Sequence, residues 1–186
     1  MITPDRVSAV LVTRGDCDMA PITDSIKEAG ITDIVIWNNA DREVDLGIYG
    51  RYRAIAEARN PVIVTQDDDL MVTCWDKILA AYKTGTVTVN YPEPWDIPWT
   101  GRGAIFDSDL PMKAFDKYLG KHPFDRLFTH RICDAVFTLL SDTVVIDEGS
   151  EDLPLGFQAG RVSTSDGWYD RDRPEAQRRC RELLAA

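Results

Sequence analysis

The chain opens with short apolar runs that alternate with helical segments, and this alternation is the feature that most constrains its fold. Three runs rich in β-branched residues, at 7–13, 34–37 and 62–65, are typical of strands, and the nearly continuous apolar run at 7–13 is typical of a strand buried on both faces of a sheet. The segments between them, at 18–30 and 49–58, have the spacing and end signals of helices. Two consecutive strand-helix-strand units predict parallel strands joined by right-handed crossovers, with ligands bound beyond the carboxyl ends of the strands.

The rest of the chain is predicted to complete one α/β domain, a mostly parallel, Rossmann-like sheet flanked by helices with an irregular C-terminal tail. We expect helices at 73–82, 111–119 and 127–140, and short strands at 87–90, 104–106 and 144–146. Within this single domain we predict a nucleotide-binding half at 1–72, an acceptor half at 73–160 and a closing tail at 161–186.

Charge and cysteine content limit the partners and the compartment. The formal net charge of -10 argues against stable binding of a nucleic acid, because a polyanion is repelled at long range. The cysteines are far apart and lack the paired spacing of a zinc site, which favours reduced thiols and a cytoplasmic protein. No apolar run approaches the roughly 18 residues that span a bilayer, so we expect no membrane segment.

Three aspartates, Asp67, Asp68 and Asp69, directly follow the third apolar run. Their mutual repulsion at the mouth of a buried strand is costly unless a cation or solvent relieves it. Because alternate residues of an extended chain point to the same side, Asp67 and Asp69 are the predicted ligands of one metal ion. Oxygen ligands favour Mg2+ or Mn2+, whose other ligands are waters and substrate phosphates. The alternative is an acidic, solvated loop or the N-cap of the next helix.

Four pieces of the chain resemble glycosyltransferases with the GT-A fold, and in particular the exostosin-type family. The first is the strand at 7–14, whose end meets the nucleotide in that family, and the fourth combines 103–106 with the Cys133-Asp134 segment that follows it. The run at 62–69 resembles the DxD strand, and Gly50-Arg51-Tyr52 is similar to the Asn-Arg-Phe segment that precedes that strand in the family. The segment 103–106 resembles the family's Gly-Ala-Ala-Phe strand, and Cys133-Asp134 is similar to its Cys-Glu-Asp segment. The chain departs from the family at Gly50, where the family has Asn, and in lacking the Glu of the last segment.

The resemblance implies a metal-dependent transfer of a sugar from a nucleoside-diphosphate donor, with a UDP-sugar favoured, to an acceptor hydroxyl with retention of configuration. Arg51 would contact the donor, and Asp134 would act on the acceptor hydroxyl or stabilise positive charge on the sugar ring. The alternatives are a surface arginine and a solvent-facing helix residue. The predicted donor-binding residues on the sheet side are Thr13, Arg14, Asn38, Arg51, Asp67 and Asp68.

The tail at 163–171 has the composition of a loop that closes over a ligand, with small residues, aromatic residues and a cation. Arg171 and Arg173 are its candidates for clamping the diphosphate, and salt bridges to neighbouring aspartates are the alternative role. The chain has only two histidines, so a third protein ligand for the metal, if one exists, is expected to be a carboxylate such as Asp166.

Two other functions fit parts of the sequence. Asp16-Cys17-Asp18 after the first strand is similar to the nucleophile motif of haloacid-dehalogenase-type phosphatases, although two residues separate it from the strand. Nucleotidyl transfer is ranked lower, because a Gly-rich, Lys-containing loop is missing after Thr13. The acidic cluster, together with Trp95 and Trp99, would also suit a non-catalytic nucleotide-sugar-binding module, with core packing as the alternative role of the tryptophans.

Overall fold

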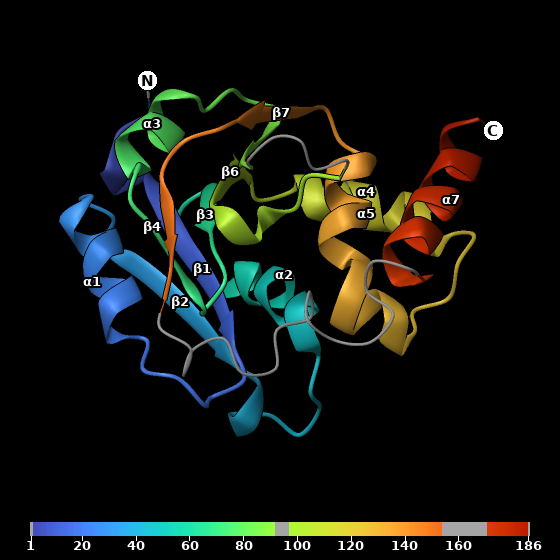
Figure 1. Cartoon of the computed structure of the whole chain (residues 1–186), viewed down its shortest axis with the longest axis horizontal. Helices are drawn as coiled ribbons and strands as arrows, with labels where there is room; N and C mark the ends of the chain where they lie inside the picture. The colour runs from blue at the N-terminus through green and yellow to red at the C-terminus, as the bar shows by residue number, and fades with distance from the viewer. Residues whose placement is uncertain (1, 92–96, 154–170, 186) are drawn as a thin grey trace.

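The computed structural model describes residues 2–91, 97–153 and 171–185, and in this part of the chain a six-stranded sheet forms the centre of the fold (Figure 1). Its strands, in spatial order, are β2 (Asp33–Asn38), β1 (Val7–Thr13), β3 (Val62–Thr65), β6 (Ala104–Asp107), β5 (Val87–Asn90) and β7 (Thr143–Ile146). The pairs β1/β2, β1/β3 and β5/β7 are parallel, whereas β6 pairs antiparallel with both of its neighbours. Of these six strands, β6 alone runs in the opposite direction.

Helices cover both faces of the sheet, as the apolar runs predict. In β1, Ala9 and Leu11 face one hydrophobic cluster, while Val10 and Val12 face the other. The first cluster is completed by α1 (Ala20–Glu28) and α3 (Trp75–Ala80). The second is completed by α2 (Gly50–Ala54), α4 (Leu110–Leu119), α5 (Cys133–Leu139) and α7 (Arg173–Leu184). Because neighbouring side chains of a strand point to opposite faces, a nearly continuous apolar run is needed to bury both.

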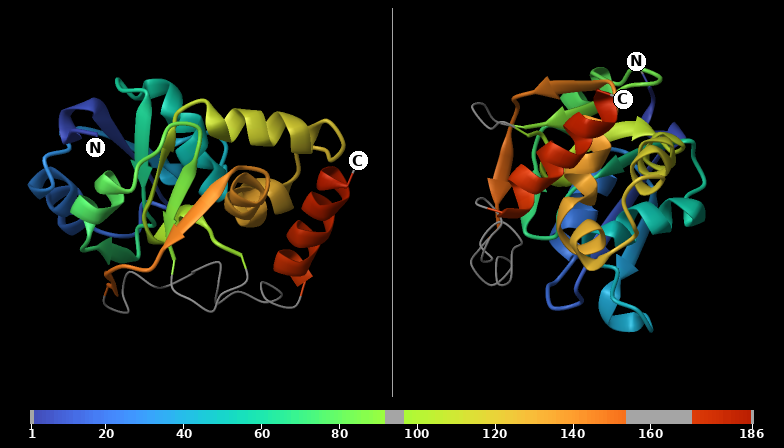
Figure 2. Two further views of the ribbon diagram at one scale, coloured as in Figure 1. Left: turned by 90° about the horizontal axis from the view of Figure 1, so that it is seen from above. Right: turned by 90° about the vertical axis from the view of Figure 1, so that its right-hand side faces the viewer.

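The C-terminal helix α7 lies at the end of the molecule remote from α1, beside α4 and α5 (Figure 2). Shorter turns join the main elements. The 3-10 turns are η1 (Pro4–Arg6), η2 (Asn39–Asp41), η3 (Gly47–Tyr49), η4 (Ile55–Glu57) and η5 (Thr100–Arg102), and η6 (Phe128–Ile132) is a π-helical turn. The turns η3 and η6 pack against each other and place aromatic side chains in the second hydrophobic cluster.

A second, two-stranded antiparallel sheet follows the acidic segment directly and was not predicted from the sequence. It consists of β4 (Leu70–Val72) and β8 (Ser150–Asp152). Gln66, which is fully buried, stabilises the turn that leads into β4. Its side-chain Nε2 donates to the backbone carbonyl of Leu70 (2.6 Å), and its side-chain Oε1 accepts from the backbone amide of Val72 (3.4 Å). The three aspartates therefore lie on a tight connection between the two sheets.

Two predicted helices differ in the structure. The helix predicted at 49–58 is divided into η3, the five-residue α2 and η4, and the one predicted at 127–140 begins as the π-helical turn η6 before α5. Helical turns of different pitch bury similar faces over such short lengths, so residue spacing does not distinguish them. The tail, predicted to be mainly irregular with a helical end, carries the twelve-residue helix α7 in its described part, which agrees with the predicted helical end.

The other structural predictions that can be compared are confirmed. The predicted strands are present, and Gly30, at the end of α1, has the positive φ of 86° expected of a C-terminal glycine. The cysteines are free thiols. Among the described residues, no helix has both the length and the apolar character required to cross a membrane.

Candidate functional site

The carboxyl ends of β1, β2 and β3 lie at one edge of the sheet, and several of the predicted donor-binding residues gather there. Thr13 and Asn38 are the last residues of β1 and β2 and are paired in register. Asp67 and Asp68 follow β3 after a single residue. In a parallel sheet this edge is where ligands bind, because the loops leaving the strands diverge there. The sheet topology thus brings together residues that are more than fifty positions apart in the sequence.

Asp67 is held in place from two sides. The guanidinium of Arg51, which is 1% exposed, donates from Nη2 to Oδ1 of Asp67, whose side chain is 33% exposed. The amide of Asp67 donates to the carbonyl of Gly101 at 2.7 Å. A Cβ atom at Gly101 would lie 2.0 Å from Oδ2 of Asp67, so only a glycine leaves room for this carboxylate. In this pair a buried guanidinium contacts a carboxylate that is partly exposed to solvent.

A second carboxylate lies on the inner side of Arg51. Oδ2 of Asp134 is 3.6 Å from Nη1 of Arg51, and Oδ1 accepts a hydrogen bond from the hydroxyl of Tyr52 at 2.7 Å. Thr100 completes the group, because its Oγ1 lies 3.4 Å from Nη1 of Arg51 and 3.2 Å from the Tyr52 hydroxyl. The side chain of Asp134 is only 8% exposed, so its carboxylate contacts Arg51 and Tyr52 rather than the protein surface.

Burial and charge oppose each other in this network. Burial alone would lower the pKa of Arg51, but the carboxylates of Asp134 and Asp67 raise it well above its ordinary value, so the guanidinium stays charged. Burial raises the pKa of Asp134, and the guanidinium of Arg51 acts against that rise. The pKa of the Tyr52 hydroxyl is raised by burial and by Asp134, so this group remains a hydrogen-bond donor.

Asp68 points toward the loop that follows β1. It takes part in a hydrogen bond with the Thr13 side chain and lies 3.4 Å, through Oδ2, from Sγ of Cys17. Burial raises the pKa of Asp68, and the charge of Asp67 raises it further. Among the described residues, Asp16, Cys17 and Asp68 form the group of three His, Cys, Asp or Glu side chains whose ligand atoms lie within 4.8 Å of one another.

Asp69, the second predicted metal ligand, lies in the turn that precedes β4, and its predicted role as a ligand remains a prediction. Asp69 is 8% exposed. Its backbone carbonyl accepts a hydrogen bond, at 3.0 Å, from the backbone amide of Leu153, the residue that follows β8. The short turn before β4 removes the extended geometry on which the pairing of Asp67 with Asp69 was predicted. The structure therefore brings Asp67 and Asp68 to the sheet edge and gives Asp69 a position inside the connection to the small sheet.

Arg14 follows β1 and Asn38 ends β2 at the same edge. Arg14 forms an exposed ion pair with Asp16 at 2.9 Å. The carboxamide of Asn38 accepts from the amide of Ala40 at 3.1 Å and packs against Gly15, where a Cβ atom would lie 2.5 Å from its Oδ1. Asn38 thus fixes the β2 loop against the β1 loop, and its predicted contact with a donor remains a prediction.

The two arginines predicted to clamp a diphosphate have different environments. Arg171 is exposed and donates from Nε to Asp172 at 2.8 Å, in agreement with the salt-bridge alternative. Arg173 is buried at the start of α7, where its guanidinium lies over the indole ring of Trp99 at 5.3 Å and donates to the carbonyl of Ile97 at 3.4 Å. These contacts support a structural role for Arg173 at the start of α7, and its predicted contact with a diphosphate remains a prediction.

Three other predictions fall on residues outside the described ranges: the closing role of 163–170, Asp166 as a metal ligand and Trp95 as a sugar platform. Trp99 is described, and it is partly buried against the second hydrophobic cluster with its ring 5.1 Å from that of Tyr91. This environment corresponds to the alternative of core packing.

The residues at the edge are compatible with a hard divalent cation. Asp67 presents a carboxylate that is one-third exposed and held in one orientation, and Asp68 adds a second carboxylate from the next position. Carboxylate oxygens are the ligands that Mg2+ and Mn2+ prefer, with the remaining positions left to water and phosphate. Cys17, beside Asp68, introduces a soft ligand that such ions do not require.

Sequence reasoning missed four residues that build this site: Tyr52, Gln66, Thr100 and Gly101. Gln66 and Gly101 are adjacent to predicted features, yet their roles depend on which backbone groups approach them in space. Tyr52 was noted as part of the Arg51 segment, and its hydroxyl function was not predicted. A buried tyrosine hydroxyl needs a partner, and this rule is the signal that could have connected Tyr52 to a polar neighbour.

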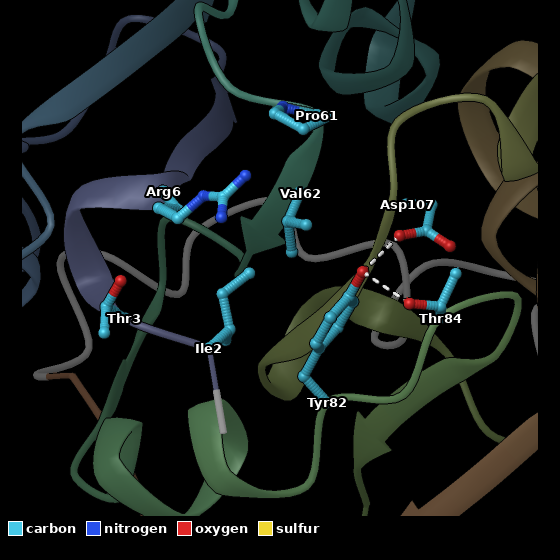
Figure 3. Close-up of a pocket in the computed structure, with 8 residues that line it drawn as sticks. All are labelled: Ile2, Thr3, Arg6, Pro61, Val62, Tyr82, Thr84 and Asp107. Atoms are coloured by element: carbon cyan, nitrogen blue, oxygen red, sulfur yellow. Dashed lines mark hydrogen bonds between the residues drawn. The ribbon is translucent and has the colours of Figure 1, made fainter.

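A cavity of about 600 Å³ lies at the opposite edge of the sheet (Figure 3). Arg6 and Val62, which line it, mark the starts of β1 and β3, and Asp107 ends the antiparallel β6. In Figure 3 the hydroxyl of Tyr82 points to Asp107, from which it is 2.5 Å away. Asp107 also accepts from the amide of Gly85 at 2.7 Å, so its carboxylate serves to hold the 82–85 turn. This cavity is separate from the predicted donor site.

Comparisons with protein-family models and with curated proteins found no match to this chain. The functional assignment therefore depends on the fold and on the geometry of the sheet edge.

Proposed function

We propose that the protein is a metal-dependent glycosyltransferase that binds a nucleoside-diphosphate sugar, preferably a UDP-sugar, at the carboxyl edge of β1, β2 and β3. The observation that carries the proposal is the Arg51–Asp67 pair, in which a fully buried guanidinium fixes a surface-reaching carboxylate at the end of a central parallel strand. Burying the charged guanidinium of an arginine costs desolvation free energy, and an acidic loop that is merely solvated does not require a buried arginine.

Each group at the edge has a chemical task in this proposal. Asp67 and Asp68 would hold Mn2+ or Mg2+, which supplies neutralisation of the negative charge that develops on a departing diphosphate. Arg51 orients Asp67 and adds positive charge close to the site. Thr13 keeps the carboxylate of Asp68 in position through their hydrogen bond. The sequence resemblance to GT-A enzymes supports sugar transfer to a hydroxyl, with retention of configuration.

Nucleotide binding can be tested by thermal unfolding with UDP, GDP and UDP-sugars, with and without Mn2+. A ligand at about 100 times its Kd stabilises the native state by about 2.7 kcal/mol, which corresponds to a rise in Tm of about 5 to 10 °C for a domain of this size. Asp67→Asn should abolish the rise. Asp24→Asn, which removes the same charge from an exposed position on α1, is the matched control. A wild-type protein whose Tm responds to none of these nucleotides would contradict the proposal.

Catalysis needs a separate measurement. Release of nucleoside diphosphate from the stabilising UDP-sugar should depend on Mn2+ and on Asp67, with water replacing the unknown acceptor in the assay. Proton NMR of the first-formed product reports whether configuration is retained. Binding without Mn2+-dependent turnover would identify a nucleotide-sugar-binding module instead.

One observation favours a second candidate, a phosphatase. The structure brings Asp16 close to Asp68, as a nucleophile and a metal-binding aspartate would require. Against it, two residues separate Asp16 from the end of β1, and Asp16 is more than half exposed and forms an ion pair with Arg14. If the wild type releases phosphate from p-nitrophenyl phosphate and Asp16→Asn does not, the protein is a phosphatase. A glycosyltransferase is expected to release no phosphate from this compound.

A further inference from the structure

The network behind Asp67 contains two carboxylates and one guanidinium. Arg51 contacts Asp67 on its outer side and Asp134 on its inner side. Paired with Arg51 alone, Asp67 would form a neutral unit and attract a cation weakly. With both carboxylates ionised, the triad has a net charge of about -1. The charge of Asp134 therefore changes how strongly the outer carboxylate attracts a cation, although Asp134 itself is buried.

The surroundings of Asp134 are those of an ionised carboxylate. Its Oδ1 accepts from the hydroxyl of Tyr52, and its Oδ2 faces the guanidinium. The ring of Tyr52 is fixed by edge-to-face contacts with Phe115 and Phe137, whose centroids lie 5.0 and 5.6 Å away. A hydroxyl held so rigidly donates in one direction, which suits an acceptor that carries a full charge.

We propose that Asp134 is a positioning residue whose buried charge balances Arg51, so that Asp67 keeps its own negative charge for the divalent cation of the nucleotide-sugar site. This inference depends on the proposed function. It replaces the predicted role of Asp134 at the acceptor hydroxyl, because Arg51 lies between Asp134 and the exposed carboxylate of Asp67. Tyr52 holds Asp134 in the orientation that this balance requires, and Thr100 contacts the hydroxyl of Tyr52.

The test measures binding of Mn2+, alone and with UDP, from the electron paramagnetic resonance signal of the free ion. Asp134→Asn preserves the shape of the side chain and removes its charge, so Mn2+ affinity should fall about tenfold. Tyr52→Phe keeps the ring contacts and removes one donor to Asp134, and we expect a loss of about two- to threefold. Tyr49→Phe removes a hydroxyl from an adjacent ring of the same aromatic cluster and should leave the affinity unchanged.

The controls distinguish this inference from a purely structural role and from the proposed function. Destabilisation of Asp134→Asn with unchanged Mn2+ affinity of the folded protein would overturn the inference. If Asp134→Asn fails to fold, Tyr52→Phe decides: equal affinity to Tyr49→Phe overturns it, and a selective loss supports it. If the wild type binds no Mn2+, or Asp67→Asn binds it normally, the proposed function fails first. If Asp67→Asn loses binding while Asp134→Asn retains it, only this inference fails.

Discussion

The most specific prediction concerns Gly101, whose lack of a side chain leaves room for the carboxylate of Asp67. In Gly101→Ala the added Cβ would lie 2.0 Å from Oδ2 of Asp67, whereas real Cβ atoms essentially never come closer than 3.0 Å to such an atom. The carboxylate must therefore move by about 1 Å, and this movement disturbs its ion pair with the buried guanidinium of Arg51. The substitution should loosen the pair without changing any charge.

The magnitude follows from Coulomb's law. At an effective dielectric constant of about 20, separating two unit charges from about 3 to about 4 Å loses roughly 1.4 kcal/mol. A weakened hydrogen bond adds about 1 kcal/mol, and the partial exposure of Asp67 reduces the total. We expect a loss of about 2 kcal/mol in the free energy of unfolding, together with weaker binding of UDP and Mn2+.

Urea unfolding measures the stability change as a lower midpoint with an unchanged m value, and thermal shifts with UDP and Mn2+ measure the loss of binding. Gly120→Ala is the matched control. Gly120 follows α4 with helical φ and ψ of -60° and -24°, and its added Cβ would meet the carbonyl oxygen of Asp116 at 3.3 Å. We expect it to change stability by no more than about 0.5 kcal/mol. Wild-type stability and wild-type ligand response in Gly101→Ala would refute the packing argument.

Two further predictions concern titrating groups. Burial and the nearby charge of Asp68 raise the pKa of Cys17 to about 11. Alkylation of this thiol at pH 7.5, followed by mass spectrometry, should therefore be slow in the wild type and several-fold faster in Asp68→Asn. Equal alkylation rates in the two proteins would show that the charge of Asp68 does not affect the thiol. Hydrogen bonds from Arg178 and Arg179 lower the pKa of Glu175 from 4.5 to about 2. The stability that this carboxylate contributes is present above pH 4.5 and is lost as the pH falls toward 2. Glu175→Gln should therefore lower the free energy of unfolding by at most about 1 kcal/mol at pH 7 and by less at pH 3. If the urea midpoints of wild type and Glu175→Gln differ by the same amount at both pH values, the assignment is contradicted.

Much of the sheet could be predicted from local sequence. Apolar runs of four to seven residues with β-branched side chains are typical of strands; β1 and β3 are buried throughout, whereas the edge strand β2 is half-buried along most of its length. The helical segments between the runs require crossovers, which predicted the parallel order of β1, β2 and β3. The position of Asp67 and Asp68 at the carboxyl edge follows from the same reasoning, because it depends only on their place after β3.

The small sheet could not be predicted in this way. The strands β4 and β8 have three residues each and lie about eighty positions apart, so neither has a recognisable period of its own. The chain turns at Asp68 and Asp69 immediately before β4, so it is not extended between Asp67 and Asp69. The prediction that alternate aspartates share one ion assumed an extended chain, and the tertiary pairing removes that condition.

The sequence by itself determined the α/β class, the parallel strands and the acidic edge, because these depend on short-range apolar periodicity and on the order of elements along the chain. Only the tertiary structure decided what the charged residues do. It buried Arg51 between Asp67 and Asp134, added the hydroxyl of Tyr52, and enclosed Arg173 beside Trp99. Whether a charge is exposed or paired depends on groups that are distant in sequence, and no local pattern records those contacts.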